Sequence, residues 1–157
     1  MVLGDIFSPD LIKIGLEGED KDEVFEELVE LYVSKNHAVS RSALLSAVKT
    51  REAKLSTGIK TGIAIPHAQT DQIQQVTGIV GISRGGIDYD ALDGKPVHVV
   101  FMILNSANSC ALHLRVLKRL ALLIENPSFY QSLVALKDPD SVYHTIRKYE
   151  DMLTTSM

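Results

Sequence analysis

The sequence predicts an α/β fold in which helices cover a β-sheet. The first observation is the segment 97–104, VHVVFMIL, whose nearly continuous apolar character is typical of a strand buried on both faces. The second is that apolar residues recur at helical spacing before and after this strand, at 24–32 and at 112–123. Because a strand buried on both faces needs helices packed over the sheet, we expect a central strand between layers of helices.

The first third of the chain predicts a short extended segment and two helices. Apolar residues at 11–16 suggest the extended segment, and Asp20 and Glu23 then form the end positions of a capping box that opens the first helix. Ser40 is placed to cap a second helix from about 41 to 51. We therefore expect a helical pair before the middle of the chain.

The middle of the chain predicts two strands separated by turns. Residues 76–84 are typical of a strand, and Gly85-Gly86 predicts a turn at its end. Asp93-Gly94 predicts a second turn, directly before the central strand at 97–104.

The last third predicts three further helices. A polar loop, NSANS at 105–109, leads into a helix from about 110 to 125. Pro127 and Pro139 each suit the first turn of another helix, where the missing N–H costs nothing.

Composition indicates one ordinary globular domain. We expect it to span 1–157, with a core of about 5–149, because no repeat, linker or low-complexity tract divides the chain of 157 residues. The hydrophobic content of 45% and charged content of 23% agree with a folded core. The net charge of −4, with basic residues scattered among acids, argues against nucleic-acid binding.

Location is predicted from what the chain lacks. The longest apolar stretch near the middle, 99–104, is far shorter than the roughly 20 residues that span a bilayer, so no membrane insertion is expected. The N-terminal MVLGDIFSPD shows no secretory signal, and the single cysteine, Cys110, cannot form an internal disulfide. A cytoplasmic location is the expectation.

His67 is the strongest candidate for chemistry. It follows the apolar segment GIAIP, in which Pro66 fixes its own φ and favours an extended Ile65. We therefore expect a strand that ends at Ile65 and a histidine on a stiff loop, where a neutral imidazole can act as nucleophile or base. The alternative is a turn histidine whose ring bonds a backbone carbonyl. The remaining histidines outside position 113 fit structural or solvated positions: 37, 98 and 144.

His113 and Arg51 give weaker signals on their own. His113 lies one turn inside a predicted helix, where its ring can approach an anion at the helix N-terminus, but a helix-surface histidine has the same pattern. Arg51 ends a predicted helix, where it can bind an oxyanion with forked hydrogen bonds or simply be solvated.

The segment STGIKTG at 56–62 predicts a loop rich in hydrogen-bond donors. The hydroxyls of Ser56 and Thr57 and the backbone at Gly58 are candidates for binding phosphate, although ordinary turns use the same residues. No glycine-rich phosphate-loop consensus is present, so nucleotide binding lacks its usual signature.

Two other site types are disfavoured. A zinc site would use His67, Cys110 and His113, but no further ligand pair completes the usual set, so no metal is expected. Cys110 also has no sequence signature of a catalytic cysteine.

Three segments in order, REAKLSTGIKTGIAIPHA at 51–68, DGKPVHVVFMIL at 93–104 and HLRVLKRLALLI at 113–124, resemble enzyme IIA components of the bacterial phosphotransferase system. The resemblance is to the fructose/mannitol and nitrogen-regulatory branch, and it covers the chain from about Leu11 through the last helix. One departure is NSANS at 105–109, where family members often carry a proline.

The resemblance implies a mixed sheet flanked by helices on both faces and a phosphoryl-carrier function without a cofactor. The phosphorylated histidine of the family matches His67, modified on its tele nitrogen by phospho-HPr or the nitrogen-branch paralogue of HPr. His113 and Arg51 match the supporting histidine and arginine. In the family the group then passes to a cysteine of enzyme IIB or acts as a regulatory mark towards a target protein.

Three functional hypotheses follow from this resemblance. The chain is a carrier in sugar transport, a regulatory phosphoprotein, or a non-phosphorylated interaction module on the same fold. The sequence carries no attached partner domain, which slightly favours the nitrogen-regulatory type. The presence of His67, Arg51 and His113 argues against the interaction module.

Overall fold

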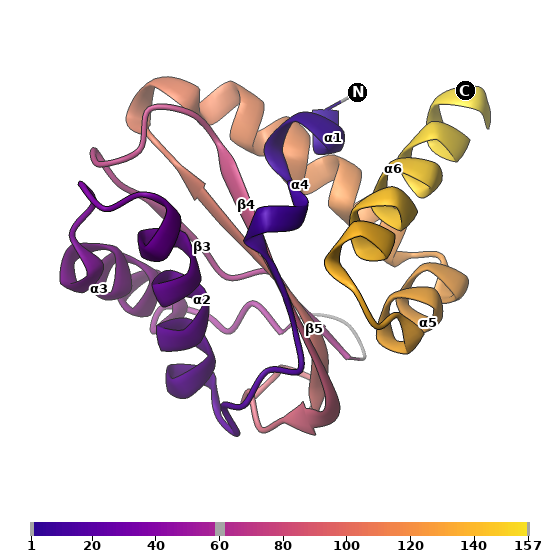
Figure 1. The fold of residues 1–157 in the computed structure, drawn as a ribbon, viewed down its shortest axis with the longest axis horizontal. Helices are drawn as coiled ribbons and strands as arrows, with labels where there is room; N and C mark the ends of the chain where they lie inside the picture. The colour runs from indigo at the N-terminus through magenta and orange to yellow at the C-terminus, as the bar shows by residue number, and fades with distance from the viewer. Residues whose placement is uncertain (1, 59–61, 157) are drawn as a thin grey trace.

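The computed structural model describes residues 2–58 and 62–156, and within these residues a five-stranded sheet lies between two layers of helices (Figure 1). The strands are β1 (Ile12–Ile14), β2 (Ile63–Ala64), β3 (His67–Gln69), β4 (Thr77–Ile87) and β5 (Val97–Asn105). The helices are α1 (Val2–Ile6), α2 (Lys21–Lys35), α3 (Arg41–Glu52), α4 (Cys110–Ile124), α5 (Pro127–Ala135) and α6 (Pro139–Ser156). Short 3-10 turns lie at Pro9–Leu11 and Ala107–Ser109.

The sheet is mixed. The strand order is β1-β4-β5-β2, and β3 also pairs with β5. Strands β1 and β4 are parallel, β4 and β5 are antiparallel, and both β2 and β3 run parallel to β5. The predicted fold class is confirmed, and β5 is the predicted central strand.

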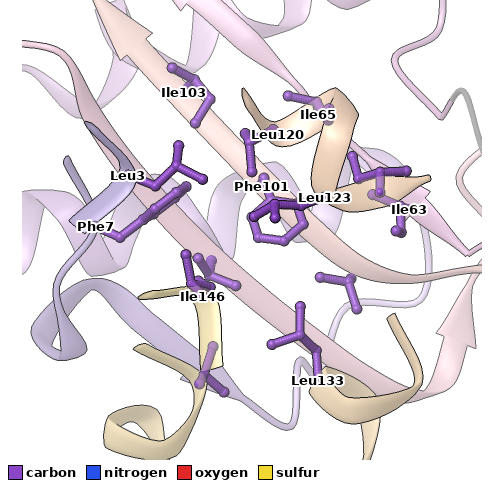
Figure 2. Packing of buried hydrophobic residues seen from close by; sticks show 14 of the residues in the cluster. Leu3, Phe7, Ile63, Ile65, Phe101, Ile103, Leu120, Leu123, Leu133 and Ile146 are labelled. Carbon is purple, nitrogen blue, oxygen red and sulfur yellow. The ribbon is translucent and has the colours of Figure 1, made fainter. Parts of the chain in front are cut away.

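Each face of the sheet has its own hydrophobic core. Helices α2 and α3 cover one face, whereas α1, α4, α5 and α6 cover the other (Figure 1). The first core includes Val24, Phe25, Leu28, Leu44, Val48, Val100 and Met102. The second includes Leu3, Phe7, Phe101, Ile103, Leu120, Leu123, Leu133 and Ile146 (Figure 2). Successive residues of β5 therefore alternate between two buried faces, which explains why this strand is apolar almost throughout.

The predicted helix starts are confirmed in most details. The Asp20 side chain accepts the Glu23 N–H at 2.9 Å and caps α2. The reciprocal bond of the capping box is shifted by one residue, because the Glu23 side chain accepts the N–H of Glu19. The Ser40 hydroxyl accepts the Ala43 N–H at 3.3 Å and caps α3.

The turn predicted at Gly85-Gly86 is wrong, because β4 continues through it to Ile87. The register with β5 shifts between Ile82 and Ile87, as expected for a β-bulge. Gly86 has φ +88°, and its N–H donates to the Ser83 hydroxyl. The glycine pair therefore bends the strand without ending it.

The turn predicted at Asp93-Gly94 is confirmed. Gly94 has φ +70°, and its N–H donates to the Ala91 carbonyl at 3.0 Å. The turn returns the chain directly into β5.

Helix α1 was not predicted from the sequence. It has only five residues, and Leu3 and Ile6 are buried in the second core. The Leu3 N–H donates to both carboxylate oxygens of Glu150, at 3.0 and 3.1 Å, and so attaches α1 to α6. Among the described residues, no helix has the length and apolar character needed to cross a membrane.

Candidate functional site

His67 lies at an edge of the sheet, where β2 and β3 follow one another along β5. Ile63 pairs with Val99 and His67 with Ile103. The predicted loop position is wrong, since His67 is the first residue of β3. Pro66 lacks an N–H, but its carbonyl still accepts the Ile103 N–H at 2.9 Å, so strand pairing resumes immediately.

The two nitrogens of the His67 ring have different partners. Nδ1 lies 2.9 Å from the carbonyl oxygen of Ile65, which can only accept a hydrogen bond. Nε2 lies 3.2 Å from Nε of Arg51, which can only donate. The two contacts together favour the neutral tautomer with a proton on Nδ1 and an unprotonated Nε2, whose lone pair accepts the Arg51 N–H.

Arg51 lies in the last turn of α3 and is held in two places. Besides its contact with His67, its Nη1 donates to the Leu55 carbonyl at 3.0 Å. Because the guanidinium is half-buried and bonded to His67, it is not a merely solvated residue at a helix end.

His113 reaches the same place from the opposite layer of helices. Its ring centroid lies 5.4 Å from that of His67, with 53° between the ring planes. Its Nδ1 is buried and has no hydrogen-bond partner among the described residues. The NSANS loop positions this helix, because the Ser106 N–H donates to the Ser109 hydroxyl in a capping box just before α4.

A pocket of about 620 Å³ opens at these residues. Its lining is Ala47, Thr50, Arg51, Lys54, His67, Ala68, Gln69, Asn105, Cys110, His113 and Leu114. Lys54, Gln69 and Asn105 were not predicted from the sequence; they lie just after α3, at the end of β3 and at the end of β5. Their only sequence signal is that they lie near the ends of a helix and two strands. The carboxyl ends of parallel strands meet at the same edge of a sheet.

Burial lowers the pKa of both histidines. For His67, burial is the main cause, and the positive charge of Arg51 acts in the same direction, whereas the Ile65 carbonyl and the Glu52 charge oppose it. For His113, burial and then the charge of His67 lower the pKa. Both rings are therefore biased towards the neutral form near pH 7.

The three residues predicted to bind phosphate lie outside the pocket lining. The Thr57 hydroxyl is buried and donates to Glu52 Oε1 at 2.6 Å. The Ser56 hydroxyl accepts the Gly58 N–H at 3.2 Å. Phosphate binding by Ser56, Thr57 and Gly58 stays a prediction, and residues 59–61 of the same predicted loop lie outside the described residues.

Sequence reasoning missed Glu52, which bonds Thr57 and is buried beside Arg51. Its signal was the Arg-Glu pair at the end of α3. In the described parts of the chain, no cluster of three or more His, Cys, Asp or Glu side chains is arranged to hold a metal ion.

Comparison with known proteins identifies related chains. The family model described as "Phosphoenolpyruvate-dependent sugar phosphotransferase system, EIIA 2" matches residues 5–149. The fructose-specific EIIABC component of Bacillus subtilis is 32% identical over 150 residues, which are 96% of this chain and 24% of that protein. This chain thus spans about a quarter of the length of that relative.

Two further relatives are similar over nearly their whole length. The fructose-specific EIIA component of Haloferax volcanii is 33% identical over 133 residues, covering 85% of this chain and 86% of that protein. The crystal structure of the nitrogen regulatory protein IIA-Ntr from Neisseria meningitidis has a TM-score of 0.86 and 30% identity, covering 93% of this chain and 99% of the other. The relatives thus carry both fructose-specific phosphotransferase and nitrogen-regulatory names.

Proposed function

Because this chain belongs to the EIIA type-2 family of the phosphoenolpyruvate-dependent sugar phosphotransferase system, we propose that Nε2 of His67 carries the phosphoryl group. The observation that supports this is the pair of contacts on the His67 ring. The Ile65 carbonyl holds the proton on Nδ1, and Nε2, the tele nitrogen, keeps its lone pair beside Arg51 in the pocket.

The proposed step is a displacement at phosphorus. The donor is phosphohistidine on HPr or on the nitrogen-branch paralogue of HPr. The Nε2 lone pair forms the new N–P bond, and the bond to the donor nitrogen breaks with its electron pair returning to the donor ring. Such a transfer depends mainly on alignment and on donors around the phosphoryl oxygens. The Nδ1 proton stays on His67, where the Ile65 carbonyl accepts it.

Arg51 and His113 support the phosphoryl group in this proposal. Once Nε2 bonds to phosphorus it no longer accepts a hydrogen bond, so the Arg51 Nε–H becomes available to a phosphoryl oxygen. His113 lies on the other side of the pocket, with its ring centroid 5.4 Å from that of His67, and its buried Nδ1 lacks a partner within the described structure. Both residues thus offer polar groups where negative charge arrives.

The acceptor of the phosphoryl group is proposed to be a cysteine of enzyme IIB or, in a regulatory role, a target protein. The name of the Bacillus relative joins EIIA to B and C components, which supports the first. The name of the Neisseria neighbour supports the second.

Phosphorylation of the purified chain tests the proposal. Incubation with phosphoenolpyruvate, enzyme I and HPr should give an acid-labile adduct that peptide mapping locates at His67 and that nitrogen NMR assigns to Nε2. His67→Ala should abolish the adduct. His98→Ala is the matched control, because the His98 Nδ1 also lies 2.9 Å from a backbone carbonyl, that of Ser83, yet His98 is absent from the pocket lining.

Two results would reject this assignment. One is an undiminished adduct in His67→Ala, and the other is an adduct located entirely on His113. Absence of any adduct on the wild-type chain would favour the non-phosphorylated interaction module.

A further inference from the structure

Glu52 is a buried carboxylate that gathers donors from three parts of the fold. Glu52 follows Arg51 directly in the sequence, and only 5% of its surface is exposed. Oε1 accepts the hydroxyls of Thr57 and Tyr89, at 2.6 and 3.1 Å. Oε2 accepts the Thr57 N–H at 2.8 Å and pairs with Lys21 Nζ at 3.1 Å. A buried carboxylate is tolerated only with such partners, so these contacts hold Glu52 in one position.

The partners of Glu52 are themselves fixed. Tyr89 is fully buried, and burial raises its pKa far above the ordinary range, so its hydroxyl stays a donor. Lys21 Nζ lies 4.8 Å from the centre of the Tyr89 ring. The Thr57 hydroxyl also lies 2.8 Å from the Tyr89 hydroxyl. The side chains of Glu52, Thr57, Tyr89 and Lys21 are therefore linked to one another in one network of contacts.

A continuous path of hydrogen bonds leads from this network to His67. The Thr57 carbonyl accepts the Ile65 N–H at 3.0 Å. The Ile65 carbonyl in turn lies 2.9 Å from Nδ1 of His67. Glu52 therefore holds Thr57, and Thr57 binds through its carbonyl the residue whose own carbonyl selects the tautomer of His67.

Glu52 also fixes the other partner of His67. It is the last residue of α3, and the preceding residue, Arg51, donates to Nε2 of His67. One side chain thus anchors both backbone segments whose groups contact the two ring nitrogens. Its negative charge also acts on the His67 ring, where it raises the pKa against the larger effect of burial.

We propose that Glu52 is a positioning residue for His67. Through Thr57 it fixes the Ile65 carbonyl and so the Nδ1–H tautomer, and through the end of α3 it fixes Arg51. The importance of this for phosphoryl transfer rests on the proposed function, but the tautomer itself can be measured without any phosphoryl donor.

Thr57→Val and Glu52→Gln test the proposal in the unphosphorylated protein. Nitrogen NMR of the imidazole gives the ratio of the two neutral tautomers of His67. In both variants the share of the Nε2–H tautomer should rise at least about threefold. Such a change in the ratio corresponds to a weakened neutral hydrogen bond between Nδ1 of His67 and the Ile65 carbonyl. Glu52→Gln should in addition lower the pKa of His67, because a negative charge that favours the cation is removed.

Glu150→Gln is the matched control. Glu150 is also a fully buried carboxylate, and it accepts a backbone N–H, that of Leu3, and pairs with Arg119 at 3.4 Å. It lies on α6, on the opposite side of the sheet from α3 (Figure 1). Its substitution should leave the His67 tautomer ratio unchanged.

Several outcomes would overturn the proposal. An unchanged tautomer ratio in natively folded Glu52→Gln would do so. If Glu52→Gln does not fold, an unchanged ratio in Thr57→Val would overturn the proposal instead, since this variant retains the backbone N–H that donates to Glu52. An equal change in Glu150→Gln would show a general effect of losing a buried charge. If the tautomer shifts as expected but the wild-type chain accepts no phosphoryl group, the positioning stands and the proposed function fails.

Discussion

The lowered pKa of His67 has a direct consequence for the pH dependence of phosphoryl transfer. Only the neutral ring offers the Nε2 lone pair, and burial, with help from Arg51, favours that form. The rate of transfer to the chain should therefore fall with decreasing pH with a midpoint below about 6.5, the ordinary histidine value. Single-turnover transfer from a fixed amount of phosphorylated donor, measured from about pH 5 to about pH 8, checks this, with the decline compared to the NMR titration of His67. A midpoint at or above the ordinary value would contradict it.

Arg51 and His113 are expected to act on rate more than on folding. Arg51→Ala and His113→Ala should each slow transfer by about 100-fold, the low end of the cost of removing one pre-organised donor. Rapid-quench measurements check this. Lys54→Ala is the control for Arg51, because Lys54 lines the same pocket and carries the same charge but is exposed and outside the Arg51–His67 contact. A loss in Lys54→Ala as large as that in Arg51→Ala would indicate a general effect of positive charge.

At the residue level, a local signal singles out His67, whereas Arg51 and His113 gain their expected roles from the family resemblance and the contacts of Thr57 depend on tertiary structure. A proline before a histidine and an arginine at a helix end are visible along the chain. The bond of Thr57 to Glu52 closes over five residues, but its contact with Tyr89 joins residues 32 apart. No spacing rule predicts that contact, so the partners of the Thr57 hydroxyl could not be found from the sequence.

The bulge in β4 gives a prediction at the level of elements. Gly86→Ala should destabilise the fold by about 2 kcal/mol, because Gly86 has φ +88° and an added Cβ would lie 3.0 Å from Cβ of Pro96. Gly85→Ala is the control, since an added Cβ there meets nothing within 4 Å. Urea unfolding followed by circular dichroism measures both. Equal stability of the two variants would mean that the bulge tolerates a side chain at either position.

The elements predicted correctly are those that local patterns specify. Helices α2, α3 and α4 have periodic apolar faces, α2 and α3 also have side-chain N-caps, and β5 is apolar almost throughout. Helix α1 has only five residues, and its N-terminus is bonded by Glu150, far away in the sequence. Strand β3 exists because β5 offers a free edge beyond Pro66. Both depend on partners that only the folded chain brings near.

At the scale of the whole molecule, the site lies where the two layers of helices come together at one edge of the sheet. Arg51 comes from α3 on one face, His113 comes from α4 on the other, and His67 lies on β3 between them. A charge placed on His67 therefore faces both layers at once. Because the pocket also opens to solvent beside exposed Leu114, this charge is presented to any docked partner.

Phosphorylation should consequently change which partners bind. A phosphohistidine adds about −1.5 to −2 near neutral pH, by analogy with other phosphorylated side chains, to a chain of net charge −4. Around His67 this favours partners that offer hydrogen-bond donors and repels acidic surfaces, with no refolding required. The affinity for the physiological acceptor or regulatory target should change at least about fivefold, the lower end of typical coupling strengths. Calorimetric titration of both forms measures it, with His67→Ala as the form that cannot be phosphorylated. Equal affinities in both states would exclude a switch and leave relay to an enzyme IIB cysteine as the role of the phosphoryl group.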